Sequence, residues 1–173
     1  MAEGQDRQRR NRSGCLGDDR RGKIKFTKAS LSNRDIDRTF DHGEHMTYYI
    51  GKTLATGIDD AVAKVTEALK AEGFGILTQI DVKSTLKQKI GVDFRAYRIL
   101  GACNPALAHK ALQAEDKIGV MFPCNVIVQD VGDGRVEVAA VNPLDAMGRV
   151  ENPALTSLAK EVSEKLSRVV EGL

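Results

Sequence analysis

The sequence has no long apolar run and only three cysteines, and each shortage excludes a class of protein. No stretch approaches the roughly 20 apolar residues that a membrane-spanning helix needs. No apolar segment follows the N-terminal arginines, as one would in a secretory signal. An odd number of cysteines disfavours a disulfide framework. These shortages predict a cytoplasmic protein with reduced thiols and no membrane association.

Recognisable catalytic and nucleic-acid-binding patterns are also missing. The chain has no glycine-rich phosphate loop, no G-x-S-x-G, no H-E-x-x-H and no paired-carboxylate motif. Aromatic residues make up 5% of the chain and do not alternate with a basic stripe, so nucleic-acid binding is not expected. We therefore assign no catalytic residue and no cofactor, and the sequence leans away from an enzyme.

Residues 1–45 differ from the rest of the chain in charge and pattern. They carry 11 basic and 8 acidic side chains, whereas the remaining residues carry 15 basic and 16 acidic ones. Without a sustained apolar period, residues 1–45 are expected to form a disordered tail. One interpretation is a basic interaction arm. The other is that translation starts at Met46, since Gly43-Glu44 can be encoded by a purine-rich string like a ribosome-binding site.

Residues 46–173 are expected to form a single α+β domain. Thr56 and Asp59 have the capping-box spacing that begins a helix, and Gly73 ends it. Ser84 is expected to cap a short helix that Gly91 closes. Apolar alternation and glycine turns predict a mainly antiparallel sheet with helices packed on one face, because that architecture covers the apolar stripes of the helices. The expected strands are 47–54, 75–82, 94–102, 126–131 and 135–141, the last two joined by a hairpin turn at 132–134. Asn104-Pro105 and Asn152-Pro153 are expected to begin the two remaining helices. The apolar side of the first is expected to consist of Leu107, Ala111 and Leu112, and that of the second of Leu155, Leu158, Val162, Leu166 and Val169.

Two cysteines concentrate the candidate chemistry. Cys103 directly precedes the helix that begins at Asn104, and a helix dipole would lower the pKa of its thiol. With Cys124 it could form a redox pair or half of a soft-metal site. The alternative is that both are small buried hydrophobic residues that pack the sheet.

Other residues could complete such a site or form a second one. His109 and Met147 could complete a copper(I) site, although a solvated histidine is commoner at a helical position like that of His109. A set of strand residues, Tyr48, Tyr49, Tyr97 and Arg98, could line an anion pocket or be ordinary strand residues. The candidate binding or redox residues are Cys103, Asn104, Cys124, His109 and Met147.

Three motifs in this region carry a family resemblance. They are A-C-N-P-A-L-A-H-K-A-L at 102–112, F-P-C-N-V-I-V at 122–128 and N-P-L-D-A-M at 142–147. With them, residues 46–173 resemble the bacterial and archaeal family called domain of unknown function 302. The resemblance implies a TATA-box-binding-protein-like topology, with a β-α-β-β-β-β-α core plus extra short helices, and a homodimer. It implies neither DNA binding nor a catalytic role.

Three hypotheses of function follow. The first is a dimeric module that binds a small ligand or a soft metal near Cys103 and Cys124. The second is a cysteine-based redox or persulfide enzyme that uses Cys103, with Cys124 as its resolving partner. The third is a structural or interaction homodimer with no small-molecule chemistry.

Overall fold

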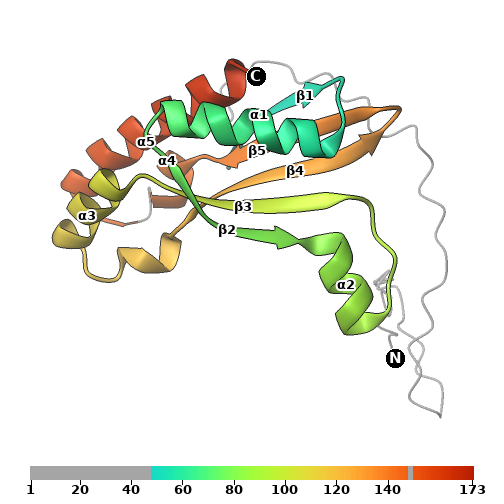
Figure 1. The fold of residues 1–173 in the computed structure, drawn as a ribbon. Coiled ribbons are helices and arrows are strands. Elements are labelled where there is room, and N and C mark those ends of the chain that lie inside the picture. The colour runs from blue at the N-terminus through green and yellow to red at the C-terminus, as the bar shows by residue number, and fades with distance from the viewer. Residues whose placement is uncertain (1–47, 148–149) are drawn as a thin grey trace, which may run out of the picture. The chain divides into compact units, whose positions relative to one another are not determined.

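The computed structural model describes residues 48–147 and 150–173, and the predicted tail, 1–45, lies outside them. Figure 1 shows the order of helices and strands. The elements are β1 (Tyr49–Leu54), α1 (Ile58–Ala71), β2 (Gly75–Asp81), α2 (Val82–Ile90), β3 (Tyr97–Cys103), α3 (Pro105–Ala114), the short 3-10 helix η1 (Ile118–Met121), β4 (Cys124–Gly132), β5 (Arg135–Val141), α4 (Pro143–Met147) and α5 (Pro153–Glu171). Without α2, α3, η1 and α4, the order of the remaining elements is β-α-β-β-β-β-α.

The strands form one sheet in the order β1-β5-β4-β3-β2, and every neighbouring pair is antiparallel. The predicted hairpin joins β4 to β5 through Gly132, Asp133 and Gly134. All three have positive φ angles, 88°, 54° and 68°, which glycine adopts without strain and aspartate tolerates. The α+β class and the antiparallel sheet predicted from the sequence are confirmed.

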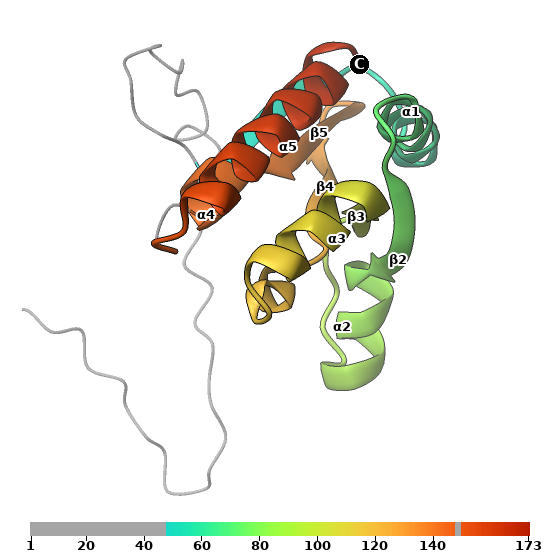
Figure 2. The same ribbon diagram turned by 90° about the vertical axis from the view of Figure 1, so that its left-hand side faces the viewer.

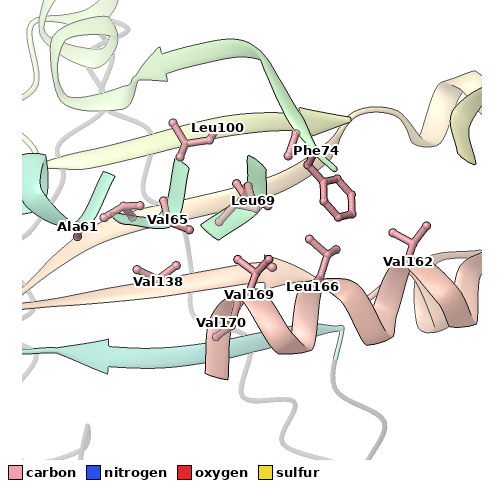
Figure 3. Packing of buried hydrophobic residues seen from close by; sticks show 14 of the residues in the cluster. Ala61, Val65, Leu69, Phe74, Leu100, Val138, Val162, Leu166, Val169 and Val170 are labelled. Atoms are coloured by element: carbon pink, nitrogen blue, oxygen red, sulfur yellow. The ribbon is translucent and has the colours of Figure 1, made fainter. Parts of the chain in front are cut away.

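Helices α1, α3 and α5 lie on the same side of the sheet (Figure 2). Val65 and Leu69 of α1 pack with Leu166 and Val169 of α5 against strand residues such as Val138, and Figure 3 shows this row of side chains. Each of these residues is at most 2% exposed, and burying one such side chain contributes about 1.5–3 kcal/mol to folding. The prediction that the helices pack on one face is confirmed. The opposite face of the sheet, which we call the open face, carries the strand residues that alternate with those buried under the helices.

Capping residues fix where the helices begin. Asn104 Oδ1 accepts a hydrogen bond of 3.2 Å from the Leu107 amide at α3, and Asn152 Oδ1 accepts one of 3.1 Å from the Ala154 amide at α5. Both satisfy amides that lack a partner in the first turn, as predicted. Gly73 has the left-handed φ of 85° expected of a residue that ends a helix.

Two predicted caps are wrong. Thr56 does not cap α1, because Gly57 is the extended N-cap residue and has no side chain to cap with. Ser84 lies inside α2, and its amide donates a 2.9 Å hydrogen bond to Asp81 Oδ1 at the end of β2. In both helices the N-cap is therefore a different residue from the one that the sequence pattern predicted.

Two smaller predictions also needed correction. The third strand begins at Tyr97 rather than at residue 94. Leu112 is 45% exposed, because Leu107 and Ala111 form the buried side of α3 and Leu112 lies about 100° farther around the helix. Within the described ranges, no helix has the length and apolar character needed to cross a membrane.

Candidate functional site

The two cysteines lie beside each other at one end of the sheet. Cys103 ends β3 and Cys124 begins β4, and the register pairs Ala102 with Cys124. Both are free thiols and both are half-buried. The cap at Asn104 positions Cys103, because it fixes the point at which β3 turns into α3.

A small cavity of about 30 Å³ opens beside these thiols. A single water needs about 10–15 Å³ of such volume, so the space holds about two or three particles of that size. Four of the five predicted site residues line it. The lining residues come from β3, α3, β4, α4, α5 and the connections next to them: Phe74, Ala102, Cys103, Asn104, Leu107, Ala108, Ala111, Phe122, Pro123, Cys124, Met147, Leu158 and Val162.

Met147 brings a third sulfur to this cavity from a distant part of the chain. It ends α4 and is 8% exposed, packed with Ala111 of α3 and Leu155 of α5. The residues that line the cavity therefore include two cysteines and one methionine, and apart from Asn104 the others are apolar. We call Cys103, Cys124 and Met147 the sulfur triad.

His109 does not join the sulfur triad. Its side chain is exposed, and it is not among the residues that line the cavity. Leu107 and Ala111 define the buried side of α3, and position 109 points away from it. The structure thus separates His109 from the other four predicted residues.

Asn104 serves the backbone as well as the cavity wall. Its Oδ1 caps α3, and its amide nitrogen lies close to Gly73, where an added Cβ would be 3.1 Å from Nδ2. Because Oδ1 already accepts the Leu107 amide, Asn104 positions Cys103 rather than offering a free ligand atom.

The electrostatics of the thiols differ from the sequence-based expectation. Burial raises the pKa of the Cys103 thiol, so the predicted lowering by the helix dipole is wrong. Burial, together with the nearby Cys103, raises the pKa of Cys124 to about 11. An apolar wall disfavours the charged thiolate. Both thiols are therefore neutral near pH 7.

Within residues 48–147 and 150–173, no three His, Cys, Asp or Glu side chains gather as a metal-binding group. A metal at this cavity would therefore need the Met147 thioether as its third ligand. Two sulfur types, thiolate and thioether, are ligands that select soft ions such as copper(I).

Sequence reasoning missed the aromatic part of the cavity wall. Phe74 follows the glycine that ends α1, and Phe122 precedes Pro123, but neither position has a pattern that marks it as part of a site. Figure 3 shows Phe74 and Val162 together at one end of the core row. The apolar stripe of α5 did predict that Leu158 and Val162 face inward.

The predicted anion pocket is not formed. Tyr48, Tyr49 and Tyr97 line a second cavity, on the open face of the sheet, but Arg98 does not. Arg98 instead forms an ion pair with Asp81 at the end of β2. The charged residue that lines this second cavity is Glu137, so its charge has the opposite sign to the one expected.

Comparisons with known proteins identify a family and a similar structure. A family model described as domain of unknown function DUF302 matches residues 50–173. The chain is also similar to a solved structure described as an uncharacterized conserved DUF302 protein from Bacillus stearothermophilus. The two are 29% identical with a TM-score of 0.67, over 72% of this chain and 96% of the other. No curated protein matches the chain.

Proposed function

The chain belongs to the DUF302 family, whose description assigns no activity, and we propose that it is a binding module for one soft metal ion held by the sulfur triad. The observation that carries this proposal is the convergence of Cys103, Cys124 and Met147 on one apolar cavity. These three residues come from β3, β4 and α4, and no local sequence motif requires them to meet.

The size of the cavity favours an ion over an organic ligand. Sites for drug-sized molecules measure about 300–1,000 Å³, roughly ten to thirty times the 30 Å³ found here. A volume of about 30 Å³ is of the size of a single ion. The apolar walls also exclude water, which would compete for the metal.

The raised pKa values favour the binding module over the redox enzyme. A catalytic cysteine attacks as the thiolate, and enzymes supply it by lowering the pKa. Both thiols here are shifted the other way by burial. A metal ion needs no activated thiol, because its charge displaces the two protons when it binds.

An anaerobic titration of purified, untagged protein with copper(I) tests the proposal, with the colorimetric chelator bicinchoninate as competitor. The wild-type protein is expected to bind one ion. Cys103→Ala and Cys124→Ala should each weaken binding about 100-fold or more, since even the loss of residues that only support metal ligands costs about 10–100-fold.

Two further variants, Met147→Leu and His109→Ala, test which residues beside the cysteines bind the metal. Leucine nearly preserves the volume of methionine, so Met147→Leu should leave the fold intact and weaken binding by about tenfold. His109→Ala should bind as the wild type does, because His109 lies outside the cavity. Equal affinities for wild type and Met147→Leu, or loss of binding in His109→Ala, would contradict the proposed ligand set.

A second observation favours a homodimer as the form in which the module acts. Strand β2 is an edge of the sheet, and α2, which follows it, has no buried residue. We call β2, α2 and the segment after α2 up to Val92 the edge arm. Four large apolar side chains on the edge arm are exposed: Leu77 (65%), Ile80 (46%), Ile90 (66%) and Val92 (47%). Exposed apolar groups on an unpaired edge are typical of a surface that another chain covers.

Sedimentation velocity at micromolar concentration tests the dimer. The wild type should sediment as a dimer, and Leu77→Asp with Ile90→Asp should convert it to a monomer. Val120→Asp is the matched control, because Val120 is 84% exposed in η1, outside the edge arm. A monomeric wild type, or a control variant that dissociates like the edge-arm variant, would count against this surface.

A further inference from the structure

The second cavity lies on the open face of the sheet and has a volume of about 340 Å³, within the range of small-molecule sites. One of its walls is a cross-strand row in which Tyr97 pairs with Gln129 and Gln129 pairs with Glu137. Its floor includes Ile127 and Ala139, which form the next cross-strand pair. Alternation along the strands turns all five of these side chains away from the helix layer.

Tyr49 encloses the cavity from β1. Its ring lies over Gly51, where an added Cβ would be 3.1 Å from Tyr49 Cε2 and 3.5 Å from the Ala139 Cβ. Tyr48 packs edge-on against it, with ring centroids 4.9 Å apart and planes at 64°. Glycine at position 51 therefore lets an aromatic ring lie against the sheet beside the small Ala139.

The carboxylate of Glu137 lacks a cationic partner in this cavity. Its Oε2 accepts a 2.5 Å hydrogen bond from Gln129 Nε2. Across the described parts of the chain, no lysine or arginine forms an ion pair with it. Arg95 is the nearby cation, but it donates to Gln129 Oε1 at 3.0 Å and lies over two rings, 4.7 Å from the Phe94 centroid and 5.7 Å from the Tyr97 centroid. It does not line the cavity.

The tyrosines and Glu137 act on one another electrostatically. Burial raises the pKa of the Tyr97 hydroxyl, Arg95 opposes this, and the charges of Glu137 and Tyr48 raise it further. These groups are thus close enough that a negative charge on one disfavours a negative charge on another. A positive charge placed among them would be stabilised by the carboxylate and by the faces of the aromatic rings.

We propose that this open-face cavity binds a small organic cation, with its ammonium group beside Glu137 and Tyr97 and its alkyl groups over Ala139 and Ile127. The charge of the cavity and its aromatic walls select the ligand, since aromatic rings with a carboxylate recognise quaternary and alkylated ammonium groups. The volume limits the ligand to a molecule of about the size of choline or a short polyamine. This site shares no residue with the sulfur triad.

Titration with choline, followed by NMR of the full chain, tests this proposal. Its neutral isostere, 3,3-dimethylbutan-1-ol, has the same shape without the charge. Choline is expected to shift the Ala139 methyl and Gln129 side-chain amide resonances with saturation, and to bind about tenfold more tightly than the isostere. Glu137→Gln should weaken choline binding about tenfold, because its amide oxygen still accepts from Gln129 but carries no charge. Glu161→Gln, which removes the same charge from the exposed side of α5, should leave binding unchanged.

Four outcomes would overturn the proposal. Choline and the isostere could bind equally, or neither could shift these resonances at tens of millimolar. Glu161→Gln could weaken binding as much as Glu137→Gln. Intermolecular contacts at Ala139 and Ile127 in a dimer would show that a second copy of the chain covers this face. Tyr97→Leu adds an independent check, since it keeps the charge of Glu137 and should still weaken choline binding by removing an aromatic wall.

Discussion

Cys124 should react with alkylating reagents far more slowly in the folded protein than an ordinary thiol does. With a pKa of about 11, about one Cys124 thiol in a thousand is ionised at pH 8. For an ordinary cysteine with a pKa of about 8.5, the fraction is about one in four. Because the thiolate is the reactive form, the difference in rate should be about 200-fold in favour of the unfolded protein.

Iodoacetamide labelling followed by peptide mass spectrometry measures this rate for each cysteine. The pH dependence separates the pKa from simple shielding by neighbouring atoms. If the pKa is near 11, the rate at Cys124 should rise about tenfold per pH unit up to pH 10, whereas an ordinary thiol levels off above pH 9. A rate at Cys124 that levels off below pH 8, or labelling of Cys103 at pH 6 as fast as that of an activated thiolate, would refute the reasoning and favour the redox enzyme.

Three further predictions concern stability. Folding favours the neutral thiol of Cys124, so the contribution of this thiol to the free energy of unfolding is present below the ordinary cysteine pKa and is lost as the pH rises toward 11. Between pH 8.5 and 11, urea unfolding should show that the wild type loses up to about 3 kcal/mol of stability that Cys124→Ala does not lose. Gly101→Ala should cost about 1–3 kcal/mol, because the added Cβ would lie 2.7 Å from Pro123 Cγ, while Gly75→Ala, with nothing within 4 Å, serves as its control; equal losses would contradict the packing argument. Removing residues 1–45 should change the free energy of unfolding by less than about 0.5 kcal/mol, and a larger loss would show that the tail was misinterpreted.

Local signals predicted the parts of the fold that depend on one or two residues. The Asn104-Pro105 pair and the glycine turn at 132–134 each fix a backbone conformation by their own chemistry, so their positions followed from the sequence. The caps at Thr56 and Ser84 failed for a related reason. A residue can cap a helix only where its own backbone is extended, just before the first helical residue. In α1 and α2 the extended residue at that position is Gly57 and Asp81, respectively, and not Thr56 or Ser84.

The candidate site was predicted in part, because tertiary packing decided the rest. Cys103 and Cys124 could be placed together, since both flank the same helix and neighbouring strands. The inward position of Met147 and the outward position of His109 depend on how α3, α4 and α5 pack, which no local pattern expresses. The pKa of Cys103 was also not predictable, because it depends on burial, which tertiary packing determines. Three residues of the open-face cavity, Tyr48, Tyr49 and Tyr97, were grouped correctly from the sequence. Its negative charge was missed, because Gln129 and Glu137 come together only through strand register.

X-ray absorption spectroscopy of the copper(I)-loaded protein tests the central claim, that the sulfur triad holds one metal ion. The account predicts sulfur atoms alone in the first coordination shell, three of them in the wild type and two in Met147→Leu. His109→Ala should give the wild-type spectrum. Nitrogen or oxygen neighbours in the wild type, a spectrum unchanged by Met147→Leu, or a protein that retains no copper would contradict it.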